Sequence, residues 1–156
     1  MTRIESTTLT PMQQPARSGG GDGLVDALVQ SSFATMAVLS RVAAENDLSL
    51  TQLRVLAILR DRRVGMTALA DFLGLERSTM TGLVDRAEKR GLLRRARNPD
   101  DGRSVDVFLT PVGAELNARL TVRVADALSP LTGPLAAPDR QRLQALLEQL
   151  LAPSGA

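Results

Sequence analysis

The change of hydrophobic period at Gly91 is the feature that most constrains the fold of this chain. Before this glycine, apolar residues recur at helical spacing in a short segment, 68–73, and a longer one, 77–90. Only Gly74 to Glu76 separate these segments, which is the spacing of a helix-turn-helix. After Gly91 the pattern alternates, as in β-strands. The order therefore predicts two helices joined by a tight turn and followed by a β-hairpin.

The predicted hairpin has a basic tip. Residues 92–97 form an extended run, and 98–102 (Asn-Pro-Asp-Asp-Gly) are a concentrated turn signal. Over 104–110 we expect two opposite faces: Val105, Val107 and Leu109 on one, and Asp106 and Phe108 on the other. Arg103 should then lie at the tip of the hairpin loop.

Other helices have recognisable starts. Ser49 and Gln52 have capping-box spacing, which predicts a helix from there to about residue 59. Thr67 is the expected N-cap of the 68–73 helix, and Thr110 that of a later helix with proline at its first position. Pro138 should open the last helix.

Only 2% of the residues are aromatic, which favours a mainly α protein. The elements described above, with a helix at each end of the chain, give the expected order α-α-α-α-β-β-α-α. Residues 1–21 predict a flexible tail. We expect dimerisation helices over 22–47 and 111–152, and a winged helix-turn-helix lobe over 48–110. The apolar stripes of the terminal helices exceed what one small lobe can cover, so they either form a homodimer or pack on each other within the chain.

The charge distribution favours a nucleic-acid partner. Residues 60–103 hold eleven basic and seven acidic residues, whereas the remainder of the chain is net acidic. Such a segment suits contacts to DNA phosphates, although a solvated helix face has the same composition. The expected phosphate contacts are Arg86, Lys89, Arg94, Arg95 and Arg97.

The 77–90 helix is expected to read DNA bases with its N-terminal end. An apolar stripe on this helix must face the core: Met80, Leu83, Val84 and Ala87. The N-terminal end of the helix, where recognition helices usually contact base edges, offers one guanidinium and three hydroxyls. These residues are Arg77, Ser78, Thr79 and Thr81.

From Met66 to Gly113 the sequence resembles the MarR family of transcriptional regulators, and the resemblance extends over about 24–151. It is carried by MTALA at 66–70, RSTMTGLVDR at 77–86, EKRGLL at 88–93, NPDDGRS at 98–104 and LTPVG at 109–113. The pair Asp101 and Arg103 is its most diagnostic element. Gly82, where relatives commonly have Arg, and Ala87, where they have a larger apolar residue, depart from the pattern.

The resemblance implies a homodimer that represses transcription from a pseudo-palindromic operator and is released by a small organic ligand. It implies that Arg103 enters the minor groove of double-stranded DNA, held by Asp101. Two-fold symmetry predicts half-sites roughly 10 bp apart. The complete set of expected DNA-binding residues is Thr67, Arg77, Ser78, Thr79, Thr81, Arg86, Lys89, Arg97, Asp101 and Arg103.

Several other classes of protein are disfavoured. The chain has no Cys and no His, which excludes disulfides, Cys/His zinc sites and His-based catalytic triads. Without a glycine-rich phosphate loop either, we expect no enzymatic activity, cofactor or metal. No unbroken run of about 18 apolar residues and no signal-peptide pattern are present, which predicts a cytoplasmic protein without a membrane segment. The alternative to a specific regulator is a winged helix used in nucleoid packaging or protein–protein assembly.

Overall fold

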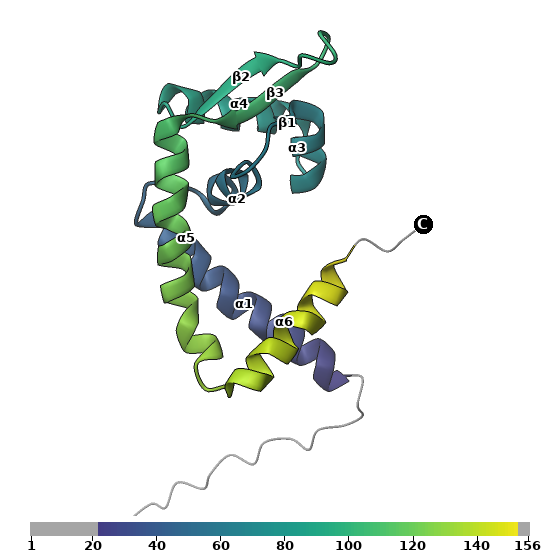
Figure 1. Cartoon of the computed structure of the whole chain (residues 1–156), viewed down its shortest axis with the longest axis vertical. Coiled ribbons are helices and arrows are strands. Elements are labelled where there is room, and N and C mark those ends of the chain that lie inside the picture. The colour runs from purple at the N-terminus through teal and green to yellow at the C-terminus, as the bar shows by residue number, and fades with distance from the viewer. Residues whose placement is uncertain (1–21, 153–156) are drawn as a thin grey trace, which may run out of the picture. The chain divides into compact units, whose positions relative to one another are not determined.

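The computed structural model describes residues 22–152, so the predicted tail over 1–21 lies outside the described residues (Figure 1). Contacts divide the chain within the first helix, into a unit up to Ala34 and a unit from Thr35 onward. The elements are α1 (Asp22–Ala44), α2 (Leu50–Ile58), β1 (Val64–Gly65), α3 (Met66–Leu73), α4 (Arg77–Lys89), β2 (Leu93–Arg97), β3 (Val105–Leu109), α5 (Pro111–Thr132) and α6 (Ala137–Leu151). The predicted mainly helical fold with a small wing is confirmed.

Two of the predicted helix starts are confirmed by their caps. The Ser49 side chain accepts from the Gln52 N–H and the Gln52 side chain accepts from the Ser49 N–H, which completes the capping box of α2. Thr110 Oγ1 accepts from the Gly113 N–H at the start of α5, with Pro111 in the first turn. These bonds satisfy N–H groups that have no partner within the helix.

The predicted start of α3 is wrong. Gly65 is its N-cap and makes no side-chain cap bond, so Thr67 lies inside the first turn. The reason is β1, which the sequence did not predict: Val64 and Gly65 pair with β3, and the chain passes directly from this strand into the helix. At the other end α3 stops as predicted, because Gly74 adopts the left-handed conformation with φ 64°. The last helix begins at Ala137, one residue before the predicted Pro138.

The sheet has the order β1-β3-β2, with all pairs antiparallel. On one face of β3 Val107 is fully buried while Val105 is exposed, and on the opposite face Asp106 is buried as well. Asp106 lies between Gly65 of β1, which has no side chain, and Ala96 of β2, whose side chain is one methyl group, so its carboxylate has room. Its carboxylate accepts from Asn98 Nδ2 at 3.1 Å, which supplies the hydrogen bond that a buried polar group needs.

The core lies between α2, α3, α4 and the sheet, and the end of α1 and the start of α5 complete it. The predicted stripe of α4 is buried: Met80, Leu83, Val84 and Ala87. The start of α5 packs directly on the chain after α4, since a Cβ on Gly113 would lie 2.0 Å from the carbonyl oxygen of Leu92. Only glycine allows this close approach between the two backbones.

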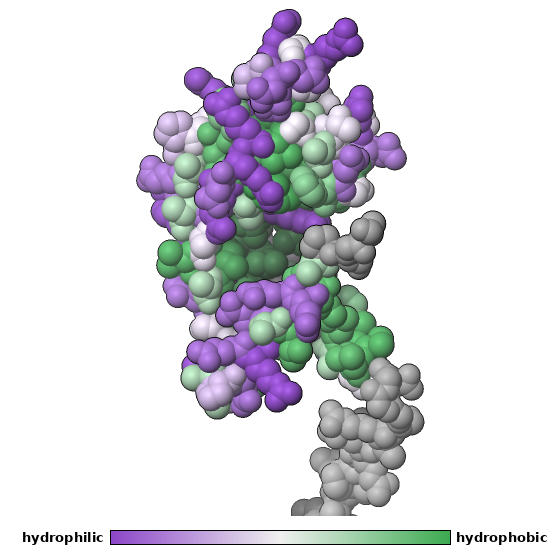
Figure 2. Space-filling model, turned by 45° about the vertical axis from the view of Figure 1, so that its right-hand side comes forward, coloured by the Kyte–Doolittle hydropathy of each residue, from purple (hydrophilic) through white to green (hydrophobic). Residues whose placement is uncertain are grey.

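Two helices leave their apolar side chains uncovered. α6 buries none of its residues, and its leucines are between 38% and 76% exposed. The first half of α1 is likewise exposed, and Figure 2 shows hydrophobic surface along its start. The exposed apolar residues of these two helices are Leu24, Val25, Leu28, Val29, Phe33, Met36, Leu143, Leu146, Leu147, Leu150 and Leu151. Within the unit from Thr35 onward, the described residues do not cover the stripe on α6.

By length and composition alone, Gly23–Ala44 in α1 could cross a membrane. Polar residues such as Asp26 and Gln30 interrupt this segment, so it forms no unbroken apolar run and was not predicted as a membrane segment. Length and apolar composition do not distinguish a membrane span from a helix that another protein chain covers.

Candidate nucleic-acid interface

The polar face of α4 is presented to solvent by the way α3 and α4 join. Gly74 turns the chain, and the Leu75 N–H donates to the Ala70 carbonyl at 3.0 Å, which holds the connection against α3. With its apolar stripe buried, α4 exposes Ser78 and Thr79 near its N-terminus. This is the end of a recognition helix that usually contacts base edges.

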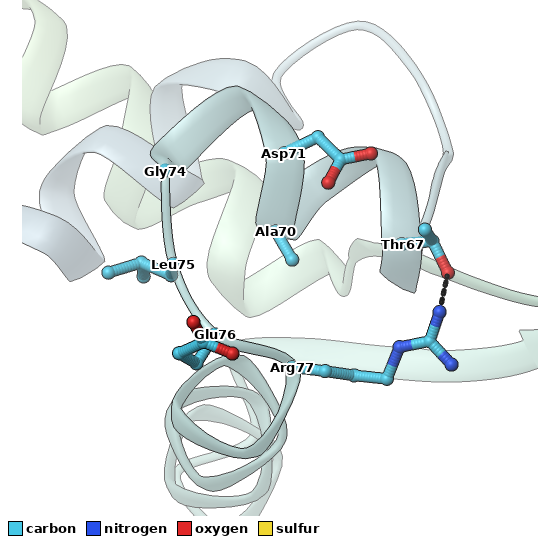
Figure 3. Close-up of a pocket in the computed structure, with 7 residues that line it drawn as sticks. All are labelled: Thr67, Ala70, Asp71, Gly74, Leu75, Glu76 and Arg77. Carbon is cyan, nitrogen blue, oxygen red and sulfur yellow. Dashed lines mark hydrogen bonds between the residues drawn. The ribbon is translucent and has the colours of Figure 1, made fainter.

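Arg77 and Thr67 come together at the start of α4 (Figure 3). Arg77 Nη2 donates to Thr67 Oγ1 at 3.2 Å, so the first residue of α4 is tied to the first turn of α3. Thr81 Oγ1 donates to the Arg77 carbonyl at 2.9 Å, which occupies that hydroxyl within the helix. Of the four predicted base readers, Ser78 and Thr79 are therefore the two whose side chains make no hydrogen bond among residues 22–152.

The wing tip is a structured loop. Asn98 Oδ1 accepts from the backbone N–H groups of Asp100 and Asp101, at 2.8 and 3.1 Å. Asp101 Oδ1 accepts from the Arg103 N–H at 3.0 Å, and its carbonyl accepts from Ser104. Asp101 thus fixes the backbone of Arg103, whose guanidinium has no partner within residues 22–152.

One arginine joins the wing to α4. Arg95 of β2 pairs through Nη2 with Asp85 Oδ1 and Glu88 Oε2, both at 2.6 Å. Its backbone N–H also donates to Glu88 Oε1 at 2.9 Å. The side-chain hydrogen bond to Glu88 is the main reason that the pKa of Arg95 is raised above its usual value. We call Arg95, Asp85 and Glu88 the wing staple. Arg95, a predicted phosphate contact, is instead occupied by these pairs.

The remaining cations around α4 and the wing are exposed. Within the described part of the chain they form no ion pair or side-chain hydrogen bond: Arg86, Lys89, Arg94, Arg97 and Arg103. The Arg86 guanidinium lies beside Gly82, since Nη1 would be 3.5 Å from a Cβ built there. Figure 2 shows hydrophilic side chains gathered at the wing end of the lobe. Because the staple pairs both carboxylates of the second half of α4, this surface is dominated by positive charge.

Comparison with known proteins identifies the family of this chain. The model of the MarR family matches residues 48–105. The HTH-type transcriptional regulator PecS of Dickeya dadantii (strain 3937) is 30% identical over 113 residues, which cover 70% of this chain and 68% of PecS. The chain belongs to the MarR family. It is also 28% identical over 132 residues to the homoprotocatechuate degradative operon repressor of Escherichia coli, covering 84% of this chain and 89% of that protein.

A solved structure supports the same assignment. The crystal structure of wild-type MarR in its apo form from E. coli superposes with a TM-score of 0.71 at 25% identity, over 87% of this chain and 99% of that chain. This MarR-family chain is thus a transcriptional regulator with a winged helix fold, as predicted. The assignment of individual residues to DNA contacts stays a prediction.

Proposed function

We propose that this MarR-family regulator binds a pseudo-palindromic operator in double-stranded DNA as a homodimer, and represses transcription until a small organic ligand releases it. The observation that carries the proposal is the wing staple. It joins the hairpin, whose Arg103 guanidinium has no partner among residues 22–152, to the helix that exposes Ser78 and Thr79. The two elements that we propose to read the DNA grooves are thereby connected.

The proposed docking assigns a role to each side chain. Ser78 and Thr79 of α4 contact base edges in the major groove, where hydroxyls both donate and accept. Arg77, with Thr67 supporting its guanidinium, contacts the DNA at the start of the same helix. Arg103 enters the adjacent minor groove and senses its width and negative potential. Arg86, Lys89 and Arg97 contact phosphates and make the affinity depend on salt.

The uncovered helices support the homodimer. The leucines of α6 are exposed in a single chain, and exposed apolar patches of this kind mark interaction surfaces in soluble proteins. We propose that the helices over 22–47 and 111–152 pack on the same segments of a second copy. A two-fold dimer then presents two lobes to two half-sites.

Relatives support repression and release by a ligand. One relative is named as the repressor of a degradative operon. Two structures of the same fold, at 23% and 21% identity, hold 4-hydroxyphenylacetate and p-coumaroyl-CoA, so this fold accommodates aromatic ligands. A coupling of about 1.4 kcal/mol between ligand and DNA would change DNA affinity tenfold. We accordingly propose a regulatory, non-enzymatic role in the cytoplasm.

The test is fluorescence anisotropy of the full chain on duplexes tiled across its own upstream region, with scrambled DNA as control, at two salt concentrations. We expect one duplex to bind at least about a thousandfold more tightly than scrambled DNA. Light scattering on the same sample should give the mass of two chains. Equal, weak and salt-sensitive binding to every duplex would instead favour nucleoid packaging or protein–protein assembly.

A further inference from the structure

Two arginines from other helices bind the turn that follows α1. α1 ends at Ala44, and Asp47 has a left-handed backbone with φ 55°, which turns the chain toward α2. Arg90 Nη1 donates to the Asp47 carbonyl at 2.6 Å, and Nη2 makes a longer contact of 3.5 Å with the Asn46 carbonyl. Arg123 Nη2 of α5 pairs with Glu45 Oε2 at 2.7 Å. We call residues 45–47 the α1 turn.

The position of Arg90 at the end of α4 makes its contact informative. Arg90 is the C-cap of α4, and the next residue, Gly91, adopts a left-handed φ of 70° while the Leu92 N–H bonds back to Ala87. The backbone from which the Arg90 side chain extends is therefore fixed relative to the recognition helix. Its guanidinium joins that helix to two backbone carbonyls of the α1 turn, just beyond the C-terminal end of α1.

This contact joins parts of the sequence that are far apart. Arg90 lies 43 positions after Asp47 in the sequence, and Arg123 lies 78 positions after Glu45. Apolar packing also holds the end of α1, because Val42 and Ala43 are buried in the core. Because this packing remains, loss of the Arg90 bond should leave the lobe folded. The direction of α4 relative to the end of α1 should nevertheless vary more, since one of its two restraints is gone.

We infer that Arg90 is a positioning residue that sets the spacing between the two recognition helices of the dimer, and that it does so without contacting DNA. The inference rests on the proposed homodimer on two half-sites. If α5 belongs to the dimer interface, the α1 turn is held to that interface, because Arg123 of α5 pairs with Glu45. A rigid bond from there to α4 then defines how far apart the two α4 helices lie, and hence which half-site separation binds best.

The experiment measures spacing preference with full-length protein. The wild type first selects its operator from a random duplex library, and one or two base pairs are then inserted into or deleted from the centre. Affinities for this series are compared for wild type, Arg90→Ala and Arg62→Ala. Arg62 is the matched control, because its Nε also donates to a backbone carbonyl, that of Ile58 at 3.1 Å. This bond is local, since Ile58 ends α2 only four residues before Arg62.

We expect Arg90→Ala to lose about threefold to tenfold in affinity for the best spacing and much less for the shifted ones, so that the preference flattens. Arg62→Ala should keep the wild-type preference. Arg90→Lys retains the charge and can donate to one carbonyl, so its spacing preference should lie between those of wild type and Arg90→Ala. If the alanine variant does not fold, the spacing preference of Arg90→Lys is the test.

Two results would overturn the inference. An unchanged spacing preference in a folded Arg90 variant would show that the contact does not set the separation. A uniform loss at every spacing, with the slope of log affinity against log salt reduced by about 1, would show that Arg90 contacts a phosphate. A wild type that selects no operator refutes the proposed function itself, and that outcome is seen before any variant is compared.

Discussion

The winged lobe and the terminal helices of this chain solve the burial of apolar side chains in opposite ways. Met80, Val84 and Val107 in the lobe are fully buried within the chain. In α6 no residue is buried, although five leucines recur along it at helical spacing. The amphipathic pattern is equally clear in both regions. A periodic stripe therefore shows that a helix face will be covered, but not whether the same chain covers it.

Gly113→Ala should cause the largest loss of stability, because it disturbs the buried junction where α5 meets the lobe. The added Cβ would lie 2.0 Å from the Leu92 carbonyl, so the backbone itself must move. We expect a loss of about 3 kcal/mol in the free energy of unfolding, measured by chemical denaturation. Gly23→Ala is the control, since nothing lies within 4 Å of its new methyl group. Equal stability of the two variants would contradict the packing described at this junction.

Leu147→Asp tests whether another copy covers α6. The residue is 43% exposed in the single chain, so the lobe should remain folded while the proposed dimer weakens by about 2 kcal/mol or more, roughly thirtyfold. Analytical ultracentrifugation gives the dimer dissociation constant. Gln141→Asp adds the same charge on the opposite face of the helix and should leave it unchanged. Identical association of both variants would remove α6 from the proposed interface.

Arg103→Ala should affect DNA binding without affecting the lobe. The guanidinium projects from the wing tip and has no partner among the described residues, so its removal leaves no buried group unsatisfied. We expect a tenfold loss of operator affinity, about 1.4 kcal/mol, with unchanged thermal unfolding. Arg119→Ala, which breaks an exposed pair with Glu115 on α5, is the control for loss of charge. An equal loss of operator affinity in both variants would mean that Arg103 contributes to DNA binding only through the net charge of the protein.

Arg95→Met should give the smallest effect, because the wing staple is about one-third exposed and solvent screens it. We expect a loss of about 0.5–1 kcal/mol in stability and a few-fold loss in operator affinity. The salt dependence of DNA binding should stay that of the wild type, since Arg95 does not contact phosphate in our proposal. A slope reduced by about 1 in anisotropy titrations would assign Arg95 to a phosphate instead. Arginine is protonated at any pH near neutrality and the ion pairs raise the pKa of Arg95 further, so no pH dependence is expected from this residue.

Local signals in the sequence were sufficient for much of the fold. The caps of α2 and α5, the left-handed stop at Gly74 and the buried stripe of α4 each depend on residues within one or two turns. The strand β1 could not be found in this way, because two residues carry no period. Because β1 was not predicted, Thr67 was assigned as the cap of the helix that follows it.

The candidate interface was predicted by residue type, and its internal bonds were not. Arg77, Arg90 and Arg95 all belong to the basic segment, yet the structure ties each to a partner from another element. Composition cannot separate a free arginine from a bonded one when the partner lies far along the chain or is a backbone carbonyl. Asp85 and Glu88, three apart on one helix face, were the available signal for the staple.

The exposed leucines of α6 have a consequence for how a cell would use this protein. If a second copy covers them, the amount of assembled regulator at low expression rises with the square of the number of chains. Halving synthesis would then reduce the DNA-binding form about fourfold, and a promoter under its control would respond as a threshold rather than in proportion. The same helix that leaves one chain incomplete would thereby make the genetic response steep.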